Sequence, residues 1–114
     1  MIVRTLGKLE VMQNAHNVDA RSLYDHETAV ITALTLQPGQ SLKRHITPVD
    51  VAFYVVSGKG VVAIGDESCA VEADTLVESP KGIVHAWYNE GTVPLRILVI
   101  KAPRPTNATV FVGS

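Results

Sequence analysis

The sequence has little of what would support disulfide, zinc or thiol chemistry. It contains one cysteine, Cys69, which cannot form an internal disulfide and has no CxxC partner for a zinc ribbon or a redox pair. No histidine lies near Cys69 in the sequence, so a small strand residue is favoured over a nucleophile. The sequence therefore excludes a disulfide-stapled fold and a cysteine-based zinc site.

An excess of charge of one sign and long apolar runs are also missing. Ten Lys and Arg stand against eleven Asp and Glu, and no basic stripe gathers to meet a phosphate backbone, so we expect no nucleic-acid partner. The longest apolar runs, residues 51–56 and 97–100, are far shorter than the roughly 20 residues that cross a bilayer. Arg4 interrupts the first apolar run too early for a signal peptide. We expect a cytoplasmic protein without a membrane partner.

Sustained helical periodicity is absent, and short β-branched runs recur between turn residues instead. The length of 114 residues and the hydrophobic fraction of 46% suit one packed domain. So many short strands fit a sandwich, a jelly roll or a closed barrel, and composition alone does not choose among these. We predict a polar loop before Thr28 and strands at residues 9–12, 28–37, 51–56, 61–64, 69–72, 75–78, 86–89 and 95–101.

The most informative stretch is residues 80–85, where a Pro and Gly turn delivers a histidine to the start of the next strand. The pattern PxGxxHxxxN, the second sequence motif of the cupin superfamily, is matched by Pro80, Gly82, His85 and Asn89. The chain therefore resembles a cupin. Asp74 replaces the glycine that leads this motif, and aspartate still tolerates left-handed backbone angles.

The resemblance implies an all-β fold, the cupin-type double-stranded β-helix or jelly-roll barrel. It predicts a single domain over residues 1–114, with the barrel at about 28–101 and a proline-rich C-terminal arm at 102–114. Residues 109–112 end that arm with a β-prone apolar patch, for which we expect a role in a homodimer interface. A frayed terminus is the alternative.

The first cupin motif, GxxxxxHxHxxxExxxxxxG, is only partly present. Thr47 stands in place of its second histidine, and Val51 stands in place of its metal-binding glutamate. Asp50 is no substitute, because a shift of one residue turns a strand side chain to the opposite face. The positions that do match are Gly39, His45 and Gly58.

Cupins with both motifs complete hold a divalent iron, manganese, nickel, zinc or copper ion through three His and one Glu. By resemblance, His45 and His85 inherit two of those metal-binding places. Two protein ligands are marginal, since a firm site generally has three or four. We therefore expect any divalent metal to be weakly held, with Glu78, His26 and Tyr54 as conceivable additional ligands. The alternative is a pair of pocket histidines that carry no metal.

Three further residues are candidates for contact with a bound cofactor or ligand: Thr47, Phe53 and Trp87. Trp87 shares strand parity with His85 and could form a stacking wall, and core packing is an equal alternative for it. Core packing is favoured for Phe53.

Other polar residues near the motifs are expected to have structural roles. Asn89 precedes Glu90 and Gly91, so we expect it to form a turn. We expect His16 and His26 on the solvated surface, because both lie in polar sequence.

We predict a small cupin of unassigned reaction whose barrel pocket, around two histidines, binds a small polar or anionic molecule. An enzyme could be a metal-assisted oxygenase or isomerase, or a metal-free catalyst that uses a histidine as general acid or base. The alternative is a metal-free binding or regulatory module without catalytic activity. The sequence leaves both classes open, because cupins share a scaffold more than a reaction.

Overall fold

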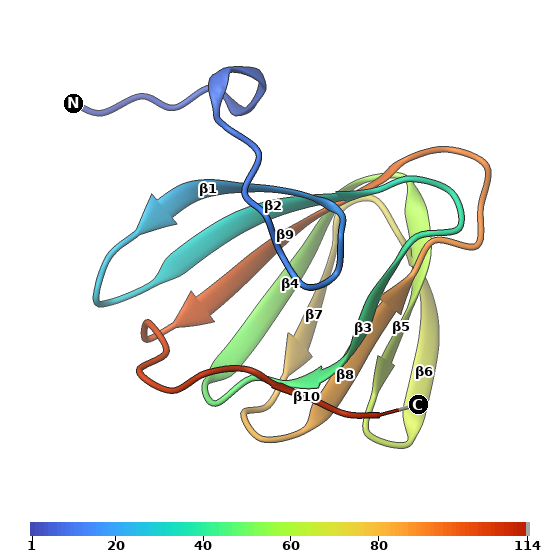
Figure 1. Cartoon of the computed structure of the whole chain (residues 1–114). Helices are drawn as coiled ribbons and strands as arrows, with labels where there is room; N and C mark the ends of the chain where they lie inside the picture. Colours follow the sequence, from blue (N-terminus) through green and yellow to red (C-terminus); the bar gives the residue numbers. More distant parts are fainter. Residues whose placement is uncertain (114) are drawn as a thin grey trace.

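Two five-stranded antiparallel sheets face each other across one apolar interior in the computed structural model, which describes residues 1–113 (Figure 1). The first sheet has the order β1 (Asp19–Asp25), β2 (Val30–Leu36), β9 (Leu95–Ala102), β4 (Asp50–Ser57) and β7 (Thr75–Ser79). The second has the order β10 (Val110–Phe111), β3 (Ser41–Ile46), β8 (Val84–Tyr88), β5 (Lys59–Ile64) and β6 (Glu67–Glu72). The predicted all-β jelly-roll architecture is confirmed.

Among the residues that the structure describes, helical content is limited to one 3-10 turn, Leu6–Lys8. Within residues 1–113, no helix is long and apolar enough to cross a bilayer.

Most of the predicted strands are present, and the errors lie in the first half of the chain. Residues 9–12 form no strand; their one backbone bond to the barrel runs from the Met12 N–H to the Ala20 carbonyl. The segment expected as a polar loop contains β1, and β3 was not predicted at all. In β3, Leu42 and His45 are both buried although they are three residues apart, because a bulge lies between them. That bulge breaks the alternation by which strands are identified.

The core lies between the inner faces of the two sheets. On β4 and β9 every second residue is buried, as half-buried strands require. The rings of Phe53 on β4 and Trp87 on β8 meet edge to face across the interior, with centroids 5.4 Å apart. Other fully enclosed side chains complete this layer: Leu36, Leu42, Val55, Leu95 and Ile97.

Among the turns that use the left-handed backbone region, those at Gly58 and Asp74 show why their residue types suit it. Gly58 has φ +81°, and a Cβ there would lie 2.3 Å from the Pro94 carbonyl oxygen, so only glycine fits. Asp74 has φ +63°, as expected for the residue that replaces the leading glycine of the second motif. Its carboxylate also accepts a hydrogen bond of 2.8 Å from the Tyr54 hydroxyl.

The C-terminal arm leaves β9, crosses the lower end of the barrel in Figure 1 and reaches the edge of the opposite sheet. There Val110 pairs with Ile46 and Phe111 pairs with His45. The apolar patch of the arm therefore has a partner within its own chain, and the homodimer stays a prediction. Ser114, the last residue of the predicted arm, lies outside the described residues.

Candidate functional site

The lower end of the barrel interior is lined by two rows of cross-strand partners, one on each sheet. Residues directly opposite each other on antiparallel strands point to the same face. In the first sheet, Val51 pairs with Lys101 on one side and with Ser79 on the other. In the second sheet, His45 pairs with His85. The two histidines of the cupin motifs therefore lie side by side, as the resemblance implied.

The two imidazoles contact each other directly, with their Nε2 atoms 2.9 Å apart. His45 Nδ1 lies in close contact with the Lys43 carbonyl oxygen, and since a carbonyl only accepts, this nitrogen carries a proton. The lone pair of His45 then lies on Nε2, where it accepts the Nε2–H of His85. His85 Nδ1 is left as an acceptor and receives the Ser79 hydroxyl at 2.7 Å.

This order of donors forms one continuous chain, from Ser79 through His85 and His45 to the Lys43 carbonyl. Ser79 belongs to β7 and His85 to β8, so the chain also joins the two sheets. Thr47 Oγ1 lies 3.2 Å from His85 Nε2. Each described polar group of the pair has a partner, which fixes the tautomer of both rings.

Burial keeps both histidines neutral. His45 is 8% exposed and His85 is 2% exposed. Desolvation, reinforced by the nearby His45, Lys101 and His16, lowers the pKa of His85 to about 3. Burial also lowers the pKa of His45, against the opposing effect of its bond to the Lys43 carbonyl. At pH 7 the pair therefore presents hydrogen-bonding groups without a formal charge.

His16 is a third histidine of this site, and the expectation of a solvated position for it is wrong. Its ring is half-buried, 4.9 Å from the ring of His45 and 5.4 Å from that of Phe111. Its Nδ1 accepts the Lys43 N–H at 2.8 Å. Burial, with His45 and two lysines nearby, lowers its pKa to about 4. By contrast, His26 is exposed as expected.

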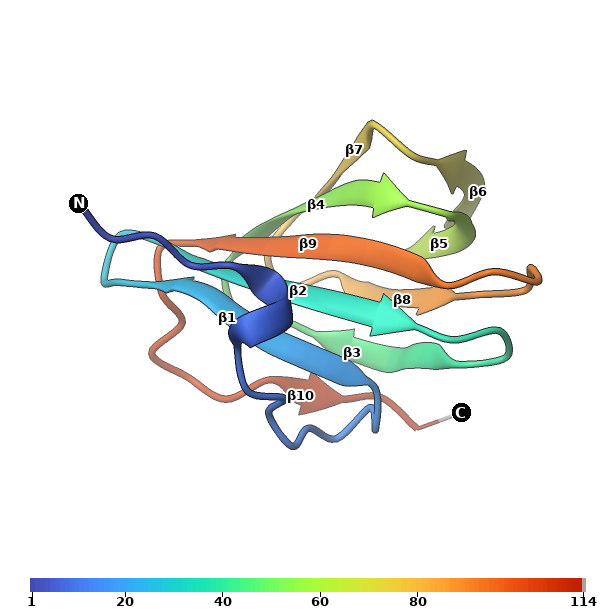
Figure 2. The same cartoon turned by 90° about the horizontal axis from the view of Figure 1, so that it is seen from above.

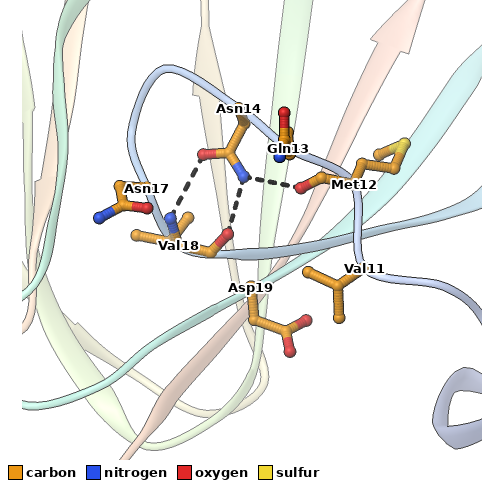
Figure 3. A pocket seen from close by; sticks show the side chains of 7 residues that line it. All are labelled: Val11, Met12, Gln13, Asn14, Asn17, Val18 and Asp19. Atoms are coloured by element: carbon orange, nitrogen blue, oxygen red, sulfur yellow. Dashed lines mark hydrogen bonds between the residues drawn. The ribbon is translucent and has the colours of Figure 1, made fainter.

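Hydrogen bonds of Asn14 hold the loop that brings His16 to the barrel (Figure 3). The Asn14 amide donates to the carbonyls of Met12 and Val18, and its oxygen accepts the N–H groups of His16 and Val18. A pocket of about 480 Å³ lies against this loop, lined by residues between 11 and 19. In Figure 2 the loop passes close to β10, which agrees with the contact between His16 and Phe111.

Lys101 is a second residue that sequence reasoning missed. Leu95, Ile97 and Val99 are buried on the inner face of β9. Lys101 continues that face at the lower end of the barrel interior, which also holds the histidine pair and is called the polar end below. It is half-buried and opposite Val51, which occupies the glutamate position of the first motif. Counting every second residue along β9 would have found it.

The remaining predicted site residues fall into two groups. Trp87 and Phe53 are enclosed in the core, and the Phe53 ring contacts both His85 at 5.1 Å and Trp87. They form the floor beneath the histidine pair, and the Trp87 Nε1–H has no hydrogen-bond partner among the described residues. Thr47 is buried against His85.

None of the proposed additional metal ligands reaches the pair. Glu78 is exposed, and the Tyr54 hydroxyl donates to Asp74. Asp50 points outward and accepts the backbone N–H of Lys81, as expected for its strand parity. Asn89 has the predicted turn role, because its amide donates to the carbonyls of Leu36 and Val93.

The geometry fits two ligands of a metal ion but not a complete set. Two ligand nitrogens, each about 2.1 Å from a metal, are about 3.0 Å apart at a right angle and about 3.4 Å apart in a tetrahedral site. The two Nε2 atoms, 2.9 Å apart, suit the right angle once the proton between them is displaced. In the part of the chain that the structure describes, no three His, Cys, Asp or Glu side chains form a group that could hold a metal. Val51 supplies no charge, and Lys101 beside it is a cation. These residues do not fit a firmly held metal.

The comparison with known proteins settles the family. The family model of the cupin domain matches residues 33–101, more than half of the chain. The chain belongs to the cupin family. No protein of curated function matches it.

Solved structures extend the likeness to nearly the whole cupin chain. The TT1209 protein from Thermus thermophilus is 28% identical, with a TM-score of 0.79, over 92% of this chain and 100% of that one. A double-stranded β-helix protein from Klebsiella pneumoniae is 18% identical, with a TM-score of 0.82, over 98% and 97%. The polyketide cyclase RemF from Streptomyces resistomycificus, also 18% identical, has a TM-score of 0.85 over 100% and 87%. At 18% identity these two show the fold alone.

Proposed function

We propose that this cupin binds a small polar or anionic molecule at the barrel end formed by His45 and His85. The observation that carries the proposal is the direct contact of two buried, neutral imidazoles in a chain of defined donors and acceptors. Ser79 and Thr47 enclose His85, and the rings of His16 and Phe111 pack against His45, so a ligand reaches the pair past these neighbours. Any divalent metal is held weakly, because it would use the two Nε2 atoms alone and would have to displace the proton that His85 Nε2 donates to His45.

Such a site suits either general acid–base chemistry or simple binding. A hydrogen-bonded imidazole pair can relay a proton to or from a bound molecule, but a pKa of about 3 makes His85 a weak base at pH 7, which favours the binding role. RemF is a cyclase on the same fold, which shows that this scaffold supports catalysis in another protein. The alternative is a binding module without turnover. Val51 favours this alternative, because it stands where metal-dependent cupins have a glutamate ligand.

The test is a binding screen with small carboxylic acids, sugars and amides, followed by the imidazole 15N resonances of the protein. We expect binders to shift the His45 and His85 resonances and to lose affinity at least tenfold in His45→Gln and His85→Gln. His26→Gln is the matched control, because it removes an exposed histidine outside the site. Binders that leave both resonances unchanged, or that bind His45→Gln and His85→Gln as tightly as the unmodified protein, would contradict the proposal.

We also propose that the protein is a homodimer. Val110 and Phe111 remain 58% and 45% exposed on β10, an edge strand whose outer side has no partner strand among residues 1–113. Light scattering after size-exclusion chromatography should give twice the chain mass, and Val110→Lys should lower it. A monomer at all working concentrations would reject the dimer.

A further inference from the structure

Lys101 lies beside the position at which a metal-dependent cupin has its glutamate. It is the cross-strand partner of Val51, which occupies the glutamate position, and both share the inner face with Ser79. The polar end therefore lacks the acidic side chain of a metal-dependent cupin and holds a basic side chain instead. A site with this charge favours an anionic ligand over a metal cation.

The surroundings of Lys101 offer no anion of the protein itself. Within the described part of the chain, the salt bridges join Arg21 to Asp19 and Arg104 to Asp25, and Lys101 takes part in neither. A half-buried ammonium without a carboxylate partner is costly, because burial removes part of its hydration. Burial accordingly lowers the pKa of Lys101. A bound anion would supply the missing partner.

Lys101 lies near His16, His45 and His85, and its positive charge disfavours protonation of each of these three rings. Strand pairing places Lys101 at their end of the interior: it is opposite Val51, Val51 is opposite Ser79, and the Ser79 hydroxyl donates to His85 at 2.7 Å. The positive charge of Lys101 accordingly contributes to the lowered pKa of each of the three rings. Neutral imidazoles contribute hydrogen bonds without charge, so Lys101 supplies the formal charge of the cluster. A ligand complementary to it carries one anionic group and at least one neutral polar group.

We propose that the ligand of this cupin is a small organic carboxylate, whose anionic group binds Lys101 while a neighbouring polar group reaches the His45–His85 pair. The ammonium takes the place of the divalent metal as the positive charge of the site. This inference rests on the proposed function and specifies its ligand class. It also explains why the incomplete metal set is not simply a damaged one.

The experiment compares two probes of nearly equal shape, glycolate and its neutral amide glycolamide, in NMR titrations of 15N-labelled protein. We expect the unmodified protein to prefer glycolate about tenfold, as a charge-assisted hydrogen bond implies. Lys101→Met should abolish the preference, and Lys101→Arg should restore part of it. Lys59→Met is the matched control, because it removes an exposed lysine at the start of β5, away from the histidine pair, and should leave the preference unchanged.

We expect the Lys101→Met variant to fold, so a change in its ligand preference reports on binding. Lys101→Met removes a partly desolvated charge and keeps the length of the apolar stem, so its urea midpoint should equal or exceed that of the unmodified protein. As a second readout, Zn²⁺ should bind Lys101→Met several-fold more tightly, because a repelling charge is gone.

The outcomes separate the two proposals. If both probes shift the His45 and His85 resonances but Lys101→Met keeps the preference for glycolate, the role of Lys101 is wrong and the proposed binding site stands. The role of Lys101 is also wrong if the unmodified protein binds both probes equally. If neither probe affects these resonances, while compounds of the broader screen do, the carboxylate assignment fails. If nothing affects them, the proposed function fails together with this inference.

Discussion

The two ends of the barrel interior are lined by the same strands but by different chemistry. On β8, Trp87 belongs to the apolar end and His85, two residues earlier on the same face, to the polar end. On β9 the corresponding residues are Val99 and Lys101. The apolar end packs rings and aliphatic side chains, whereas the polar end connects hydroxyl and imidazole groups. The comparison indicates that one end maintains the fold and the other is available for ligand chemistry.

The sharpest test of this division compares alanine at the two ends of β8. Trp87→Ala should lower the free energy of unfolding by about 3–5 kcal/mol, because it opens a cavity in a closely packed layer. His85→Ala should cost only about 1–2 kcal/mol, since it removes hydrogen bonds and leaves polar groups that water can reach. Urea unfolding measures both. Equal losses would break the distinction between a structural end and a functional one.

Restoring the ligands of the first motif should turn the polar end into a metal site. Thr47→His with Val51→Glu should raise the affinity for Zn²⁺ or Ni²⁺ at least a hundredfold by calorimetry, because the site then has four ligands. Thr47→His with Val51→Gln is the matched control, which adds the same volume without the charge. If the Glu variant folds and gains no affinity over the control, the histidine pair is not arranged for metal.

Acid should destabilise the polar end selectively. The pKa values of His85 and His16 are lowered to about 3 and about 4, below the 6.5 of the unfolded chain, so the unfolded state takes up protons first as the pH falls. Stability is therefore full above about pH 6.5 and declines below it. Urea midpoints at pH 7.5, 6 and 5 should fall in order, and less steeply in His85→Gln than in His26→Gln. Stability that is constant or rises from pH 7.5 to 5 would contradict the burial of neutral histidines.

The smallest expected effect concerns Ser79, which holds the tautomer of His85. Ser79→Ala should cost about 1 kcal/mol, the net value of one hydrogen bond. The 15N shifts of His85 should change toward a mixture of tautomers, while those of exposed His26 stay unchanged. Unaltered His85 shifts would show that Ser79 does not orient the ring.

The sequence predicted the barrel and the histidine pair because their signals are local. The PxGxxH turn places His85 through backbone geometry within a few residues, and Asp74 keeps the left-handed angle of the glycine that it replaces. The residues that were missed depend on long-range contacts. His16 reaches His45 only through the fold of a loop held by Asn14, and nothing in its polar surroundings indicates that contact.

Lys101 and β3 were missed for different reasons. The alternation of buried residues on β9 was available in the sequence and points Lys101 inward, but its position opposite Val51 depends on strand pairing. In β3 the bulge between Leu42 and His45 removes the alternation itself. A pattern of side chains reports the face of a regular strand and fails where the backbone is irregular.

Elemental analysis of the purified, tag-free protein after dialysis against buffer without chelator tests the central claim most directly. The account predicts iron, manganese, nickel, copper and zinc far below one equivalent per chain, because His45 and His85 are two ligands beside a lysine. One equivalent of any of these metals retained through dialysis, and lost in His85→Gln, would contradict it.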